Sequence, residues 1–223
     1  MPNQSGNAYG LTTLCPLLKA EDYWRTHERG PSLHDSPATL LKDLLNDVPL
    51  DHQSPMAAVP DTYLCRFFVL DDVVFESKPA IDEHLKSKYL VFTSNFHGEL
   101  EPYLRGMWQH AAAFLQRAFA YCVAFDEVKS EDAFVAWIKR CQVTTTFYFN
   151  GSTDEPLAEQ LKALYLKQEL SRFAAEQQGK PAAELQRAFE AFVERVRPTE
   201  LEGPTWRAGA TTLDRLVRQG GEA

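Results

Sequence analysis

The fold of this chain is decided by the stretch DTYLCRFFVLDDVVF (residues 61–75), ESKPAIDEHLKS (76–87) and KYLVFTSNFHG (88–98). The first and last segments are rich in aromatic and β-branched residues, and their side chains alternate with the two-residue period of a strand. The middle segment is acidic and lysine-bearing, which is typical of a connection in solvent. The stretch therefore predicts two central strands, Pro60–Phe75 and Tyr89–His97.

Both faces of the first central strand carry apolar side chains, so we expect both to be covered. One layer of helices covers only one face of a small sheet. The other face must then meet the second half of the chain or a second subunit. Arg66 is the one full charge in this run, and we expect it to be buried against a carboxylate or an anionic ligand. The two faces are Tyr63, Cys65, Phe67 and Val69, and Leu64, Arg66, Phe68 and Leu70.

The rest of the chain supplies further strands and a set of helices. We expect a loose terminus at residues 1–7. Turn-prone residues in Lys19–Asp35 predict a loop or short helix. Apolar periodicity and capping residues predict the helices. The predicted strands are Ala8–Leu18, Tyr121–Phe125 and Val143–Asn150, and the predicted helices follow Ser36, span Glu99–Phe119, follow Ser130, span Pro156–Gln178, follow Pro181 and span Thr211–Arg218.

The order strand, helix, strand, strand, helix, strand over residues 8–126 is that of the ferredoxin-like split βαβ unit. Such a unit is an antiparallel sheet with helices on one face. Residues 127–196 predict a partial second repeat, rich in helix and packed on the first, and residues 197–223 predict a C-terminal tail. The expected fold class is therefore α+β.

Composition indicates an ordinary globular protein of 223 residues, 44% hydrophobic and 24% charged. The net charge of −8 argues against nucleic acid or an anionic membrane as a partner. No apolar run is long enough to span a bilayer, and the first residues lack the pattern of a signal peptide. Cys15, Cys65, Cys122 and Cys141 show no zinc-ligand spacing. We expect reduced core thiols in a cytoplasmic protein.

The candidate ligand-binding residues are few. Asn95 and His97 lie where the second central strand ends, and Tyr63 begins the first. His97 is either a metal or haem ligand or general base, or an exposed turn residue. Arg66, with Asp71 or Asp72, either binds an anion or forms a structural ion pair.

His110 lies on a face of the long helix together with Tyr103, Met107, Phe114 and Arg117. This face either lines a cleft or forms an ordinary helix interface. No second ligand lies three or four residues from His110, so the sequence predicts no metal pair on this helix. Asp71-Asp72 is a further metal candidate, for which a solvated turn is the alternative.

The central stretch resembles a largely uncharacterised bacterial group of ferredoxin-like proteins. That group is similar to one half of the dye-decolourising-type haem peroxidases, in the dimeric α+β barrel superfamily. The likeness covers roughly residues 9–178. It is carried by Val59–Tyr63, Arg66, Val69–Asp72, Tyr89–Phe92, Ser94–Phe96, Gly98 and Thr144–Phe147.

Two departures from the family pattern stand out. The family tends to have His at the position of Tyr63 and Asp at the position of His97. The chain also lacks the Gly-x-x-Asp-Gly segment of the peroxidases' distal side.

Three classes of function remain open. The first, favoured because site residues are sparse, is a module that binds a small ligand or acts as a non-catalytic homodimer. The second is an oxidoreductase of peroxidase or monooxygenase type that uses Arg66, His97 or His110, with haem as the cofactor that the resemblance implies. The third is a structural or regulatory partner of a separate enzyme. We expect a homodimer because residues 131–196 offer only one strand to cover the second sheet face.

Overall fold

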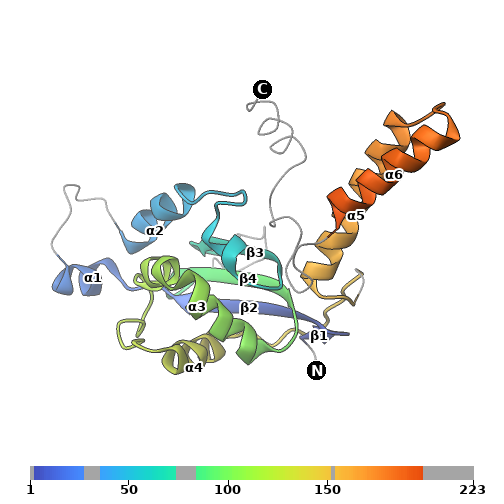
Figure 1. The fold of residues 1–223 in the computed structure, drawn as a ribbon. Helices are drawn as coiled ribbons and strands as arrows, with labels where there is room; N and C mark the ends of the chain where they lie inside the picture. The colour runs from blue at the N-terminus through green and yellow to red at the C-terminus, as the bar shows by residue number, and fades with distance from the viewer. Residues whose placement is uncertain (1–2, 28–35, 74–83, 152–153, 198–223) are drawn as a thin grey trace, which may run out of the picture. The chain divides into compact units, whose positions relative to one another are not determined.

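The computed structural model describes residues 3–27, 36–73, 84–151 and 154–197 (Figure 1). The chain divides into two compact units, Met1–Asp154 and Glu155–Ala223. The fold is α+β, as predicted, with an open antiparallel sheet in the first unit.

The sheet has four strands in the order β1-β2-β4-β3, and every neighbouring pair is antiparallel. Three strands fall where the sequence predicts them, with shorter bounds for two. The predicted loose terminus is wrong at β1, where Asn3 beside the strand is also buried. The strands are β1 Gln4–Ser5, β2 Ala8–Pro16, β3 Thr62–Leu70 and β4 Tyr89–His97.

Two predicted strands are absent from the described residues. In Tyr121–Phe125, only Cys122 forms a bridge, to Leu17. In Val143–Asn150, the only backbone amide that donates to β2 is that of Val143, which bonds to Thr12 O at 2.8 Å. A segment with β-rich composition forms a strand only where a partner strand runs alongside it. Here the two segments touch the outer edge of β2 only at isolated points.

Helices cover one face of the sheet. Ser36 and Ser130 cap their helices as predicted, each accepting a hydrogen bond from the amide three residues on. The long helix and α4 lie side by side against the same face of the sheet (Figure 1). The helices of this unit are α1 Ala20–Thr26, α2 Pro37–Asn46, the 3₁₀ turn η1 Pro55–Ala58, α3 Leu100–Phe119 and α4 Glu131–Cys141.

The core lies between this helical layer and the sheet. Alternate residues of the strands point into it, and α3 and α4 supply its other side. Phe92 of β4 stacks on Phe67 at 4.5 Å between ring centroids and meets Phe119 edge-on. Trp137 is buried and donates its indole N–H to Val123 O at 3.2 Å. A single aromatic core thus holds one face of the sheet.

Within the described residues of the first unit, the second face of β3 is open. Its predicted cover, by the second half of the chain or by a second subunit, stays a prediction. Leu64 is 48% exposed and Phe68 45% exposed. The second unit consists, within the described residues, of α5 Leu157–Glu176 and α6 Ala182–Val196. Helix α4 packs on α3 and falls within the first unit.

The two helices of the second unit form a hairpin around a small aromatic cluster. Gly179, with φ of 75°, lies in the turn, where a left-handed conformation favours glycine. Phe173, Phe189 and Phe192 contact one another with ring centroids 4.8–6.0 Å apart. The predicted helix Thr211–Arg218 lies outside the described residues. None of the helices in the described ranges combines the length and apolar character that a membrane span requires.

Candidate functional site

The open face of the sheet brings together four of the five residues singled out from the sequence. Along each strand, every second side chain points into the core, and the side chains between them point to this open face. Arg66 and Asn95 lie on it by register, and His97 follows two residues after Asn95. Tyr63 reaches the same face through an irregularity in β3. Across β3, β4 and β2, the rows are Phe68–Val91–Leu14, Arg66–Thr93–Thr12 and Leu64–Asn95–Gly10, with His97 and Ala8 paired beyond them.

A β-bulge in β3 turns Tyr63 toward His97. Between Thr62 and Leu64, two steps along β3 match a single step along β4. A bulge of this kind re-aims one side chain out of the regular alternation. Tyr63 Oη therefore lies 3.0 Å from His97 Nδ1, and both side chains are half-buried. The expected placement of Tyr63 on the face of Cys65 is wrong for this reason.

The backbone just before the bulge is strained. Asp61 has φ of 60°, in the left-handed region that costs a non-glycine residue on the order of 1 kcal/mol. Its carbonyl accepts a hydrogen bond from the amide of His97 at 3.0 Å. The strand ends are thus tied together both by backbone and by the Tyr63–His97 pair. His97 is a residue of the sheet rather than of an exposed turn.

Arg66 is exposed, which contradicts the expectation of a buried guanidinium. It faces away from the helical layer, between the half-exposed side chains of Leu64 and Phe68. No carboxylate of the described residues forms an ion pair with it. The charge therefore stays in water, and an anionic group can reach it on an otherwise apolar face.

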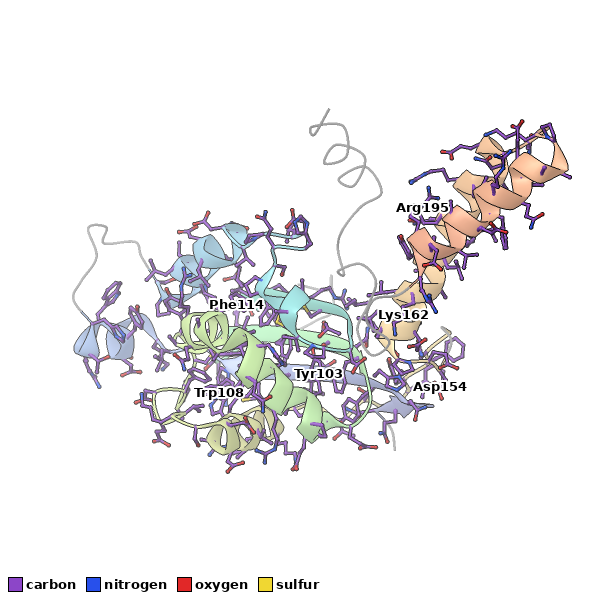
Figure 2. All side chains as sticks on the ribbon, viewed as in Figure 1. Tyr103, Trp108, Phe114, Asp154, Lys162 and Arg195 are labelled. Carbon is purple, nitrogen blue, oxygen red and sulfur yellow. The ribbon has the colours of Figure 1, made fainter. Side chains whose placement is uncertain are left out.

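Behind the site, on the helical side, three hydroxyls form a buried network. Tyr103 Oη lies 2.7 Å from Ser94 Oγ and 3.0 Å from Thr62 Oγ1. Its ring stacks on Phe96 with centroids 3.6 Å apart. Burial raises the pKa of Tyr103 to about 12. Figure 2 shows Tyr103, Trp108 and Phe114 projecting from α3.

The β2 side of the open face is partly covered by the segment that follows α4. The ring of Tyr148 lies against Gly10, where an added Cβ would come within 2.7 Å of its Cε2 atom. Backbone amides of this segment bond to side chains of the N-terminus, as Thr145 N does to Asn3 Oδ1 at 2.9 Å. Asp154 accepts two hydrogen bonds from Asn7. The cover reaches β2, while Leu64 and Phe68 on β3 stay exposed.

His110, the fifth candidate, lies apart from the other four beside a pocket of about 330 Å³ between α3 and the end of α2. The helix face that carries His110 is only partly buried. Phe114 is buried, whereas His110 and Arg117 are exposed. Leu44 of α2 and Val48, two residues after its end, line the opposite wall. Helix α3 is kinked at this wall, since Ala111 has φ of −129° and ψ of 15°. Asp47 also lines the pocket, and sequence reasoning did not single it out.

Neither histidine fits the haem site that the resemblance implies. A haem needs an axial ligand inside an apolar cavity. His97 lies on an open sheet face, and His110 is exposed at the rim of its pocket. The described residues therefore offer no enclosed site around either side chain.

The acidic pair at the end of β3 forms surface ion pairs. Asp71 is held by Lys42 and Lys88, which lower its carboxyl pKa. Asp72 accepts from the amides of Leu85 and Val73 and contacts His84 Nδ1 at 2.7 Å. These bonds lower the pKa of Asp72 to about 2. Neither aspartate pairs with Arg66 among these contacts. Across the described ranges, no group of three or more His, Cys, Asp or Glu is arranged to hold a metal ion.

Three of the four cysteines, by contrast, meet at the outer edge of β2. Cys15, Cys122 and Cys141 are free thiols from β2, the turn after α3 and the end of α4. Sequence reasoning predicted their reduced state and apolar surroundings but missed their convergence. No spacing in the sequence signals this convergence, because each of the three cysteines lies in or beside a different element.

Comparison with family models, curated proteins and solved structures found no match to this chain.

Proposed function

We propose that the chain is a non-catalytic module that forms a homodimer through the open face of its sheet. The observation that carries this proposal is the half-exposed pair Leu64 and Phe68 on β3. Phe68 lies in a cross-strand row with Val91, which is buried, and with Leu14 on β2, which is 37% exposed. Apolar patches of this kind on a small domain typically mark an interaction surface.

The charges on this face favour a second copy as the partner. The chain has a net charge of −8, but Arg66 is the only full charge in the central rows of the open face. In a two-fold arrangement each face meets its own copy, so the acidic remainder of both chains stays outside. Each Arg66 can then reach hydroxyl and amide acceptors such as Tyr63 and Asn95 of the other chain.

Light scattering at micromolar concentration tests the dimer. We expect twice the mass of one chain, which is 25.3 kDa. Replacing Leu64 and Phe68 by Asp should give the mass of one chain, because each change puts a charge into the interface. Leu50→Asp is the matched control, since Leu50 is 97% exposed in a loop. A mass of one chain for the wild-type protein at every concentration would overturn the proposal.

The pocket beside His110 favours a second candidate function, the binding of a small ligand. Its volume of about 330 Å³ lies at the lower end of the range for ligand sites, roughly 300–1,000 Å³. Leu44, Val48 and Phe114 give it apolar walls, while His110 and Arg117 place two donors seven residues apart on one helix. This chemistry fits an apolar molecule that carries a carboxylate.

Thermal-shift measurements with a set of short aliphatic and aromatic carboxylates test this second function. Ligands that bind should raise the melting temperature, and Arg117→Ala should abolish the shift. Arg25→Ala is the control, because Arg25 pairs with Asp22 on α1 and does not line the pocket. A shift that survives Arg117→Ala would place the ligand elsewhere.

The oxidoreductase alternative has one observation in its favour. The contact from Tyr63 to Nδ1 fixes the orientation of the half-buried His97 ring. The visible absorption spectrum of the purified protein, with and without added haem, tests this alternative. A Soret band that disappears in His97→Ala would support it, and a spectrum that stays featureless on titration would remove its haem form.

A further inference from the structure

The backbone brings two distant cysteines to Cys15 from opposite sides. Cys122 bridges Leu17, two residues beyond Cys15 on the chain. Gln142, which follows Cys141, bridges Thr13, two residues before Cys15. Both contacts lie on the outer edge of β2. Cys122 and Cys141 therefore both come next to Cys15 in the backbone.

The thiols themselves are in contact. Cys15 and Cys141 form a hydrogen bond between their side chains, and Cys15 Sγ also lies 3.5 Å from Thr13 Oγ1. Cys122 is near enough to both for an electrostatic effect. Cys65, the fourth cysteine, lies on β3 and takes no part in these interactions. The cluster is therefore a specific dithiol with a third thiol beside it.

Solvent reaches these thiols unequally. Cys15 is fully buried and Cys122 is 1% exposed, whereas Cys141 is partly exposed at the end of α4. The hydrogen bond from Cys15 lowers the pKa of Cys141, and the nearby Arg140 acts in the same direction. The same bond, together with burial, raises the pKa of Cys15 strongly. Cys141 is thus the thiol that both has a lowered pKa and meets solutes, which is the combination that makes a cysteine reactive.

We propose that Cys141 and Cys15 form an oxidisable dithiol, in which a hydroperoxide attacks at Cys141 and Cys15 closes a disulfide. The Cys141 thiolate attacks the terminal peroxide oxygen, the O–O bond breaks, and an alcohol or water leaves after protonation. The sulfenic acid of Cys141 is then attacked by the sulfur of Cys15. The S–O bond breaks, and the hydroxyl leaves as water with the proton of Cys15. Two thiols and one hydroperoxide give one disulfide, one alcohol or water, and one further water.

The change of charge at Cys141 makes the second step favourable. In the reduced pair, the hydrogen bond to Cys141 raises the pKa of Cys15, and burial and the nearby charge of Cys141 act in the same direction. Oxidation of the Cys141 thiolate to the sulfenic acid removes that charge and the bond to a thiolate. Cys15 can then lose its proton and attack. The product would join β2 covalently to the end of α4.

Treatment of the full chain with hydrogen peroxide tests the proposal. Under denaturing conditions, we expect the four free thiols of the reduced chain to fall to two. Peptide mapping should then find Cys15 linked to Cys141. Cys141→Ser should abolish the cross-link, and Cys65→Ser is the matched control that should leave its rate unchanged. A disulfide from Cys141 to Cys122, or oxidation that begins at Cys65, would overturn the proposal.

Two further measurements guard against a variant that fails to fold. Cys15→Ser should leave Cys141 without its partner, so that peroxide carries Cys141 on to the sulfinic acid. In the unmutated chain, iodoacetamide should label Cys141 at least about tenfold faster than Cys65 at neutral pH, because only Cys141 has a lowered pKa. Faster labelling of Cys65 would contradict the assignment without any substitution.

Discussion

Tyr63 Oη and His97 Nδ1 lie 3.0 Å apart, so one side-chain contact joins the start of β3 to the end of β4. The bulge between Thr62 and Leu64 turns Tyr63 toward His97. At the same point the amide of His97 donates to the carbonyl of Asp61 at 3.0 Å. The two strand ends are therefore coupled both by side chains and by backbone.

A double-mutant cycle should measure this coupling. Tyr63→Phe and His97→Ala each remove one partner, and the double variant removes both. We expect a coupling of about 0.5–1.5 kcal/mol in the free energy of unfolding, the usual contribution of one hydrogen bond. Tyr89→Phe, on the same face at the start of β4, is the control. Additive effects at Tyr63 and His97 would mean that the hydrogen bond contributes nothing to stability.

Much of the fold was predictable because local signals agreed with tertiary structure. The two-residue period placed β4 at Tyr89–His97 without error, and Ser36 and Ser130 marked the starts of α2 and α4. The failed strand Val143–Asn150 had equally strong local composition. Its amides instead bond to Asn3 and Ser5, and no local pattern shows that a partner strand is missing.

The sequence predicted which residues form the candidate site, but not how their side chains are arranged. Arg66, Asn95 and His97 share a face by simple alternation. Tyr63 joins them only through a bulge, which has no clear sequence signal beyond Asp61 before it. The exposure of Arg66 follows from which face the helices cover. An apolar pattern on both faces of a strand does not reveal that.

The buried hydroxyl network predicts a loss of stability at high pH. The pKa of Tyr103 is raised from 10 to about 12, so the folded state holds its proton longer than the unfolded state does. The contribution is complete below pH 10 and is lost as pH rises toward 12. Tyr103→Phe should flatten this part of the profile. It should also lower the free energy of unfolding at pH 7 by about 1–3 kcal/mol, since Ser94 and Thr62 lose a partner.

Denaturant titrations from pH 8 to pH 12 measure both effects. Tyr121→Phe provides a comparison, because its phenol is only partly buried and its pKa is raised less. An alkaline slope identical in Tyr103→Phe and wild type would show that Tyr103 does not govern it.

At Asp72 we expect a matching loss of stability at low pH. Its pKa is lowered from 3.8 to about 2 by amide bonds from Leu85 and Val73 and by His84. Stability from this carboxylate is present above pH 4 and is lost as pH falls toward 2. Asp72→Asn should reduce the slope of unfolding free energy across that window, with a small amplitude because the group is exposed. Asp51→Asn serves as the control, and an equal slope in both variants would argue against the assignment.

In the second unit, a buried carboxylate joins the two helices. Glu169 on α5 is 3% exposed and lies 3.2 Å from Arg172 and 3.6 Å from Arg195 of α6 (Figure 2 labels Arg195). Glu169→Ala should destabilise the hairpin by about 1–3 kcal/mol, less than for a fully buried pair because both arginines meet solvent. Amide hydrogen exchange in α5 and α6 measures the change. Glu190→Ala, exposed on α6, should leave exchange unaltered.

Alanine substitutions at Gly10, which the Tyr148 ring approaches closely, and at Gly106 should change the free energy of unfolding in opposite directions. An added methyl at Gly10 would lie 2.7 Å from the Tyr148 ring, so Gly10→Ala must push the ring off β2. We expect a loss of about 1–3 kcal/mol in the free energy of unfolding. Gly106, inside α3, has no atom within 4 Å of an added Cβ. Gly106→Ala should therefore stabilise the chain by about 0.5–1 kcal/mol.

The double variant Gly10→Ala with Tyr148→Ala separates a steric effect from a backbone effect. If the ring is the obstacle, its removal makes the alanine at position 10 nearly neutral relative to Tyr148→Ala alone. Chemical denaturation of the four proteins gives the comparison. A cost at Gly10 that persists without the ring would mean that the β2 backbone itself requires glycine, and Tyr148 would then lose its role as the cover of this part of the sheet.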